Sequence, residues 1–304
     1  MEVLILGSAA GGGVPQWNCG CRHCTSAREG GEVEPRTQDS VAVSANGEDW
    51  ILLNASPDVL QQLGKHSRLW PCTQDPRRRR SPVCGVVLTD GELDHCLGLL
   101  SLREWSPLHI YATGQVLSDL MERNVLFRTL QREREQLHKT ALPLDQFTPL
   151  SQPSGAPCGL DLRAFTVHGK VPRHLKGLSE ACPETTIGVL VRDRQSGTTL
   201  AYIPACTTLA TVDTQLEGVD CLLFDGTFWG DDEPTSVGIQ SSARGMAHVP
   251  ILGGSLGWKT PGVQQRYYTH INNTNPILRP SSAERSLAQE AGWHVARDGL
   301  HIRL

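Results

Sequence analysis

Apolar residues along the chain gather in short runs that are separated by polar, glycine or proline residues, a pattern typical of buried strands. The runs cover residues 3–6, 40–44, 50–57, 86–88, 108–113, 160–167, 185–191, 199–203, 219–225 and 267–270. Asn46-Gly47 lies between two of these runs and predicts a hairpin turn. The C-terminal segment 294–304 predicts a second hairpin, with its turn at Asp298-Gly299.

Helices are expected where apolar residues recur at the helical period. Residues 58–64 predict a short helix, and 115–139 predict the longest helix, because this range has an apolar face and contains no proline or glycine. Residues 284–291 predict a third helix that ends before Gly292, a residue typical of helix C-termini. The strands come in two sets that are each followed by helices. The sequence therefore predicts a single α/β domain over residues 1–304, with two sheets face to face and helices outside.

The composition excludes several classes of protein. With a net charge of −4 and a pI of about 6.3, the chain lacks the strongly basic face that nucleic-acid binding requires. No apolar run is long enough to span a bilayer, and the N-terminal residues do not resemble a signal peptide, so we expect a cytoplasmic protein without a membrane partner. The four arginines at 77–80 indicate a solvated loop. The sequence contains no indication of an oligomeric state.

The apolar run at 86–88 leads into a cluster of residue types that bind metals. Its members are Asp90, Glu92, Asp94 and His95. Carboxylates so close together repel one another unless a positive charge lies between them, and an imidazole adds a ligand of intermediate softness. The cluster therefore predicts a metal site, with an ordinary acidic turn before a helix as the alternative. Two later strand runs also end in such residues, the first at Asp225 and the second at His270.

Ten cysteines occur in a chain without an export signal, so free thiols and metal ligands are expected rather than disulfides. Three of them form the motif C-x-C-x-x-C at Cys19, Cys21 and Cys24. Thiolates at this spacing can converge on one tetrahedral zinc ion whose fourth ligand comes from elsewhere in the chain. An iron–sulfur cluster and unligated thiols are the alternatives. The glycine-rich segment 7–13 misses the spacing of a dinucleotide-binding loop and predicts a tight turn beside a site.

The segment from Asp90 to His95 occupies the frame of the signature H-x-H-x-D-H of the metallo-β-lactamase superfamily, although Asp90 and Glu92 replace its first two histidines. Longer motifs resemble the family of pyrroloquinoline quinone (PQQ) biosynthesis protein B, which belongs to that superfamily. These motifs are G-S-A-A-G-G-G-V-P-Q-W-N-C at 7–19, N-A-S-P-D at 54–58, D-H-x-x-G-L-L-S-L-R-E at 94–104, D-G-T-x-W-x-D-D-E at 225–233 and H-I-N-N-T-N-P-I-L at 270–278. The resemblance extends over nearly the whole chain.

The resemblance implies a metallo-β-lactamase-like αββα four-layer sandwich whose site lies at one edge between the sheets. It implies one metal ion with ligands that are intact in this chain, namely Asp94, His95, Asp225 and His270. Asp90 is a further candidate ligand. A site with two histidines, several carboxylates and open positions is closer to the ligand set of oxygen-activating iron than to the histidine-rich zinc site of hydrolases. Fe(II) is therefore expected at this site.

A second ion would need the two missing histidines and a third one. The candidates for that third position are Cys182, His168 and His174, so the second ion is expected to be weakly bound or absent. For the three cysteines, the resemblance implies a structural zinc. In related phosphodiesterases of the superfamily the fourth zinc ligand stands at the position of Asn273.

For function, the resemblance implies an iron- and O2-dependent hydroxylase that acts on the tyrosine ring of a Glu-Tyr unit derived from a precursor peptide. Its partners are then this peptide, O2 and other PQQ biosynthesis proteins. His248 is the candidate acid or base, and Asp90 and Glu92 are further catalytic candidates. Ser56 and Asp58 either line the site or form a turn and helix cap. The alternatives are a metal-dependent hydrolase and a non-catalytic carrier of PQQ or its intermediate.

Overall fold

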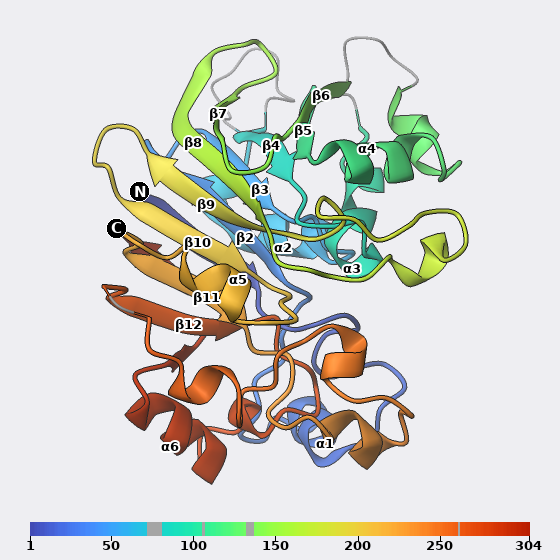
Figure 1. Cartoon of the computed structure of the whole chain (residues 1–304), viewed down its shortest axis with the longest axis vertical. Coiled ribbons are helices and arrows are strands. Elements are labelled where there is room, and N and C mark those ends of the chain that lie inside the picture. Colours follow the sequence, from blue (N-terminus) through green and yellow to red (C-terminus); the bar gives the residue numbers. More distant parts are fainter. Residues whose placement is uncertain (72–80, 105–106, 132–136, 261) are drawn as a thin grey trace.

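Two sheets form the centre of the computed structural model, which describes residues 1–71, 81–104, 107–131, 137–260 and 262–304. Within these ranges the sheets have seven strands each, in the orders β14-β1-β2-β3-β4-β5-β6 and β13-β12-β11-β10-β9-β8-β7. The sheets face each other, and helices lie on their outer sides (Figure 1). The αββα sandwich that the sequence predicts is therefore confirmed.

Each predicted run overlaps one of the observed strands. The strands are β1 (Glu2–Gly7), β2 (Ser40–Ser44), β3 (Trp50–Leu53), β4 (Val83–Val87), β5 (Leu108–Ala112), β6 (Leu137–Ala141), β7 (Phe147–Ser151), β8 (Pro157–Thr166), β9 (Ile187–Asp193), β10 (Thr199–Ile203), β11 (Cys221–Asp225), β12 (Gln265–Thr269), β13 (His294–Val295) and β14 (His301–Arg303). The α-helices are α1 (Arg22–Arg28), α2 (Val59–Lys65), α3 (Leu93–Cys96), α4 (Gly114–Met121), α5 (Ala210–Asp213) and α6 (Ala283–Glu290). None of the helices that the structure describes has the length and apolar character needed to cross a membrane.

The central strands are buried on both faces because each sheet is covered on both sides there. Along β1, Val3 packs in the layer between the sheets and Leu4 packs against the helices, since successive side chains of a strand point to opposite sides. In the second sheet, Leu223 and Leu222 on β11 divide in the same way. Burial on both faces explains why these strands appear as continuous apolar runs rather than alternating ones.

The long helix predicted over 115–139 is wrong beyond its first turns. α4 covers only the start of this range, a 3-10 helix follows at Phe127–Gln131, and β6 pairs in parallel with β5. Val125, which the pattern assigns to the apolar face, is 70% exposed. Pairing at the edge of the first sheet overrides the local helical pattern. Residues 132–136 and the arginines at 77–80 lie outside the described residues.

The C-terminal hairpin predicted around Asp298-Gly299 is also wrong. β13 pairs with β12 and β14 pairs with β1, so this segment crosses from one sheet to the other. The carboxylate of Asp298 fixes the crossing, because it accepts the hydroxyl of Ser8 at 2.8 Å and the backbone N–H of Thr37 at 2.7 Å. Turn residues are the same for a hairpin and for a crossing, so the local pattern does not distinguish them. The sequence-based prediction also omitted α1 and β7.

Parallel strands determine where a site forms. β3 to β6 are parallel in the first sheet, and β10 to β12 are parallel in the second sheet. Polar residues that follow parallel strands gather at the edge formed by the carboxyl ends. Asp90 follows β4, Asp225 ends β11 and His270 follows β12. This edge therefore carries residue types that the sequence assigned to a metal site.

Candidate metal centre

Loops after β4, β11 and β12 bring acidic and histidine side chains together. Asp94 and His95 lie on α3, the short helix after β4. The Nε2 atom of His270 lies 3.3 Å from Oδ2 of Asp94, although 176 positions separate the two residues along the chain. The rings of His95 and His270 meet edge to face, with 5.1 Å between their centroids. The fold thus places these distant residues side by side.

The side chains form two overlapping groups of candidate ligands. Ligand atoms of Asp94, His95 and His270 lie within 4.8 Å of one another, and the same holds for Asp225, His248 and His270. Within the described part of the chain, Nε2 of His95 is buried and has no hydrogen-bond partner. A buried ring nitrogen without a partner is costly, and a bound cation would accept its lone pair. These residues therefore fit a metal ion.

A second side chain holds each of two histidines in place. The carboxylate oxygens of Asp90 lie 2.8 and 2.9 Å from Nδ1 of His95, so Nδ1 donates its proton to this carboxylate and Nε2 is the nitrogen that a cation would bind. Thr227 acts in the same way on His270. Its hydroxyl oxygen lies 2.9 Å from Nδ1 of His270, and the hydroxyl donates to Oδ1 of Asp225 at 2.7 Å. Partners of this kind fix the orientation of metal-binding histidines.

This arrangement changes the role expected for Asp90 and adds Thr227. The sequence assigned Asp90 to the metal, whereas its carboxylate lies on the Nδ1 side of His95 and supports that ligand. Thr227 was not predicted. The signal that would have revealed it is the D-G-T motif, because a hydroxyl two residues after Asp225 can fold back on the carboxylate. His248, expected outside the ligand set, has its Nδ1 2.9 Å from Oδ2 of Asp225.

The carboxylates give the centre a negative character that favours a cation. Burial lowers the pKa of His95, but Asp90 and Asp94 outweigh burial and raise it to about 10. Burial raises the pKa of Asp94, but His95 and His270 bring it below its usual range. Burial, together with the charges of Asp90 and Asp94, raises the pKa of Glu92 to about 7. A bound cation would offset this accumulation of negative charge.

A cavity of about 230 Å³ lies against these side chains. Its lining combines the acidic cluster and the histidines with an apolar part that includes Phe228 and Met246. The ring of Phe228 meets that of His248 edge to face, with 5.8 Å between their centroids. A Cβ atom at Gly11 would lie 2.9 Å from Oδ2 of Asp94, so only glycine lets this loop come so close. The prediction that the glycine-rich segment turns beside a site is confirmed.

Ser56 and Asp58 do not line this cavity, and the structure agrees instead with the alternative of a turn before a helix, in which the backbone N–H of Asp58 donates to Oγ of Ser56 at 3.3 Å. The hydroxyl of Ser56 donates to Oε1 of Gln62 at 3.1 Å, and Oδ2 of Asp58 accepts the backbone N–H of Gln38 at 2.9 Å. The bond of Ser56 lies between the turn that leads into α2 and the helix itself, a common use of a short polar side chain before a helix. The bond of Asp58 joins this turn to the segment that precedes β2.

The residues proposed for a second ion do not reach the centre either. His168, His174 and Cys182 are absent from the lining of the cavity. Cys182 is exposed and lines a different hollow, beside Gln115 at the start of α4. His248 instead completes the second ligand group, from a loop that follows β11. Glu92, a catalytic candidate in the sequence, does line the cavity.

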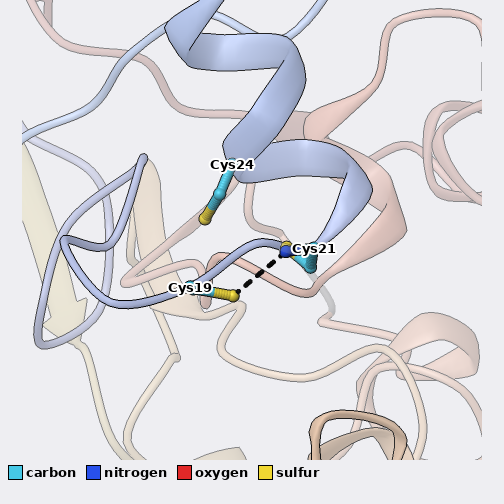
Figure 2. Close-up of side chains that lie close together, drawn as sticks. All are labelled: Cys19, Cys21 and Cys24. Carbon is cyan, nitrogen blue, oxygen red and sulfur yellow. Dashed lines mark hydrogen bonds between the residues drawn. The ribbon is translucent and has the colours of Figure 1, made fainter.

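The second candidate site is the thiol cluster, which consists of Cys19, Cys21 and Cys24. Their Sγ atoms lie within 4.8 Å of one another. The backbone N–H of Cys21 donates to Sγ of Cys19 at 3.5 Å (Figure 2). The side-chain nitrogen of Asn273 lies 3.1, 3.7 and 3.3 Å from the sulfur atoms of the three cysteines in that order. Three thiols in this arrangement fit a zinc ion, and the amide of Asn273 faces all of them.

Comparisons with known proteins identify relatives over the full chain. A β-lactamase superfamily domain matches residues 49–271. Coenzyme PQQ synthesis protein B of Methylobacterium radiotolerans is 43% identical over 314 residues, covering 100% of both chains. The crystal structure of Zn²⁺-bound PqqB from Methylobacterium extorquens is 39% identical, with a TM-score of 0.89 and 100% of both chains covered. A diphosphatase of the PhnP family shares the fold at 20% identity, with a TM-score of 0.66 over 99% of this chain and 96% of its own.

Proposed function

This chain belongs to the family of coenzyme PQQ synthesis protein B within the β-lactamase superfamily, and on that premise we propose that it catalyses a metal-dependent step in the biosynthesis of this coenzyme. The step is hydroxylation of the tyrosine ring in a Glu-Tyr unit, with Fe(II) at the centre. One oxygen atom of O2 is inserted into a C–H bond of the ring, which becomes a C–OH group. The other oxygen atom leaves as water, with two electrons and two protons from an enediol reductant such as ascorbate.

The observation that carries this proposal is the mixed ligand set around His270. Carboxylates and imidazoles lie within reach of one another there, and such a set suits iron as well as zinc. Asp90 and Glu92 replace the leading histidines of the superfamily signature. The described residues form two overlapping ligand groups that share His270 and have two histidines each, whereas the zinc sites that activate water in hydrolases are richer in histidine. Fe(II) held by this set would supply the activation of O2.

Side chains of the protein orient the metal ligands, hold the substrate ring and transfer a proton. Asp90 and Thr227 accept the Nδ1 protons of their histidines, which leaves Nε2 of each ring to bind the metal. Phe228 and Met246 offer an apolar wall against which the phenol ring of the substrate lies, and this wall keeps water from the reacting carbon. We assign His248 to proton transfer rather than to the metal: it lines the cavity, its Nδ1 lies 2.9 Å from Oδ2 of Asp225, and it exchanges a proton with the phenol oxygen.

Lys170 gives the cavity a cationic side chain. It lines the cavity, and within the described residues its ammonium group forms no hydrogen bond or salt bridge. A Glu-Tyr unit bears carboxylates, and the ammonium group of this exposed side chain attracts a carboxylate of the substrate as it enters the cavity. We assign Lys170 to a carboxylate of the substrate, with the phenol ring directed toward the metal.

The test varies the metal and the oxygen in one assay. Metal-free protein is loaded with Fe(II) under anaerobic conditions and then receives Glu-Tyr, ascorbate and isotopically labelled O2. The expected product is a dipeptide with one additional, labelled oxygen atom on its ring. The Asp94→Ala variant, treated identically, measures the reaction of unbound iron. Absence of product would contradict the proposal, and turnover of a phosphodiester or thioester by zinc-loaded protein without oxygen would favour a hydrolase.

A further inference from the structure

The side chain of Asn54, the residue after β3, is buried and contacts both sheets. Its φ angle is 62°, a left-handed conformation that asparagine adopts more readily than most residues. The backbone N–H of Thr89 donates to Oδ1 of Asn54 at 3.0 Å, which leaves both hydrogens of Nδ2 for other partners. Nδ2 donates one hydrogen to the hydroxyl oxygen of Thr89 and the other to the hydroxyl oxygen of Tyr202, with N···O distances of 3.0 and 3.1 Å. The amide group is fully used, and its partners determine its orientation.

A first chain of hydrogen bonds leads from Asn54 to His95 in the first sheet. The hydroxyl of Thr89 accepts from Asn54 and donates to Oδ2 of Asp90 at 3.1 Å. Asp90 in turn accepts the Nδ1 proton of His95. The hydroxyl of Thr89 and Nδ1 of His95 therefore donate to the same carboxylate, that of Asp90. The chain therefore stabilises the negative charge of Asp90 and, through it, the orientation of the imidazole.

A second chain leads to the other sheet and ends beside His270. Tyr202 on β10 accepts from Asn54 and donates its hydroxyl to Oδ2 of Asp39, while Thr269 donates its hydroxyl to Oδ1 of the same carboxylate. Thr269 is the last residue of β12 and directly precedes His270. Asp39 is 1% exposed, and both of its donors are fully buried. A carboxylate buried so deeply is stable only while its donors are in place.

From this geometry we infer that Asn54 and Tyr202 are positioning residues of the metal centre. The two chains meet at the amide of Asn54 and hold His95 from one sheet and His270 from the other at a separation that one ion can bridge. Neither positioning residue lines the cavity, so each acts on the metal only through these histidines. The inference rests on the metal centre of the proposed function, but it holds for any reaction that the metal supports.

The substitution Tyr202→Phe tests the inference because it removes one hydroxyl and keeps the ring. Asp39 then loses a donor, and one hydrogen of the Asn54 amide loses its acceptor. We expect Co²⁺ to bind the centre about 10- to 100-fold more weakly, the effect of lost supporting partners in other metal sites. Metal-free protein is titrated with Co²⁺, and the visible absorption of cobalt with nitrogen and oxygen ligands reports the centre. Thiolate-to-cobalt absorption in the near ultraviolet reports the thiol cluster separately.

Tyr111→Phe is the matched control. Tyr111 on β5 is 1% exposed, and its hydroxyl donates to the backbone oxygen of Ser151 at 3.1 Å, without contact to the centre. Both variants lose a buried hydroxyl, so both are expected to lose some thermal stability. Only Tyr202→Phe should weaken Co²⁺ binding at the centre. Equal weakening in the two variants, or wild-type affinity in Tyr202→Phe, overturns the inference.

Two substitutions at Thr269 keep the test decisive where Tyr202→Phe does not fold. Thr269→Val removes the hydroxyl donor to Asp39 and keeps a similar shape, whereas Thr269→Ser keeps the hydroxyl. We expect weakened Co²⁺ binding in the valine variant and nearly wild-type binding in the serine variant. Equal affinities, or a greater loss in the serine variant, contradict a positioning role for this hydrogen-bond chain.

Discussion

The metal centre and the thiol cluster are assembled in opposite ways. The thiol cluster takes its three sulfur atoms from the single segment 19–24, whereas the centre combines loops after β4, β11 and β12. The centre also depends on buried partners such as Asp90 and Thr227, which hold its histidines. The three sulfur atoms are brought together by their own loop, and only Asn273 reaches them from a distant segment. A centre that spans two sheets needs a frame that fixes one sheet relative to the other.

A short segment joins the two regions. His270 belongs to the centre, and Asn273, three residues later, faces the thiols. The next residue, Thr274, donates its hydroxyl to Oε1 of Glu233 at 2.5 Å. Segment 270–274 is held at the metal centre by His270 and at Glu233 by Thr274. We therefore expect that a loss of order at the thiol cluster disturbs the metal centre only slightly. The predictions below test how separate the two regions are.

Removal of a ligand should have the largest effect and should spare the thiol cluster. We expect Asp94→Ala to lower hydroxylation by at least about 1000-fold, or about 4 kcal/mol of transition-state stabilisation, because the centre no longer holds its metal. Metal analysis should show that the zinc of the thiol cluster is retained. The control is Asp119→Ala, a buried aspartate on α4 that pairs with Arg123 at 2.9 Å. Full metal content in Asp94→Ala would refute the ligand assignment.

Removal of a thiol should act on stability more than on catalysis. Cys24→Ser is expected to release the zinc of the cluster and to lower the free energy of unfolding by about 4 kcal/mol, the stabilisation given by a ligand at about a thousandfold excess over its Kd. Hydroxylation should fall by less than about tenfold, because the segment to His270 transmits only part of the change. Thermal unfolding and zinc content measure the effect. Cys182→Ser, at an exposed position, is the control, and unchanged zinc content in Cys24→Ser would refute the site.

The sequence predicted the elements that a periodic pattern records. Strands buried on both faces appear as apolar runs, and ligands at strand ends, such as Asp225 and His270, stand out because a polar residue follows each run. The pattern did not reveal β6, since its pairing with β5 is a tertiary contact at a sheet edge. It also did not reveal the crossing at Asp298.

The sequence did not predict the side chains that support the metal ligands through hydrogen bonds. Thr227 and Tyr202 each contribute a hydroxyl whose role depends on a residue far away in the chain or on the local fold of a loop. The D-G-T motif points to Thr227 once its local fold is known, whereas no spacing separates Tyr202 from an ordinary buried residue. The role of Asp90 changed for the same reason, because the sequence shows a carboxylate near His95 but not which ring nitrogen it faces. The residue types predict which side chains can bind a metal, whereas the fold determines which atom of each side chain faces the metal and which faces a supporting partner.

Glu233 should give the segment between the two regions a pH dependence. Burial raises the pKa of this carboxyl group from 4.5 to about 7. Between these values the folded protein binds a proton that the unfolded chain has released, so the free energy of unfolding falls as pH rises from 4.5 to 7. The full shift corresponds to at most about 3 kcal/mol.

The Glu233→Gln variant keeps a neutral side chain at every pH. Relative to the wild type, we expect it to become more stable as pH rises, measured by thermal unfolding at about pH 5 and about pH 8. Glu290→Gln, at an exposed position on α6, controls for the substitution itself. A stability difference between Glu233→Gln and the wild type that is the same at both pH values would contradict the assignment of this titration to Glu233.

Lys170 should produce the smallest effect, because it acts on the substrate and on neither metal site. Because Lys170 is exposed, Lys170→Ala is expected to raise KM for Glu-Tyr about threefold, or about 0.7 kcal/mol, with little change in kcat, as for an interaction made equally in the ground state and the transition state. Lys176→Ala is the matched control, since Lys176 is exposed in the same loop but does not line the cavity. A second substrate in which the carboxylates are converted to amides should show no difference between Lys170→Ala and the wild type. An equal rise of KM for both substrates, or an equal effect of Lys176→Ala, would mean that the lysine acts through the overall field of the loop rather than by contact with a carboxylate.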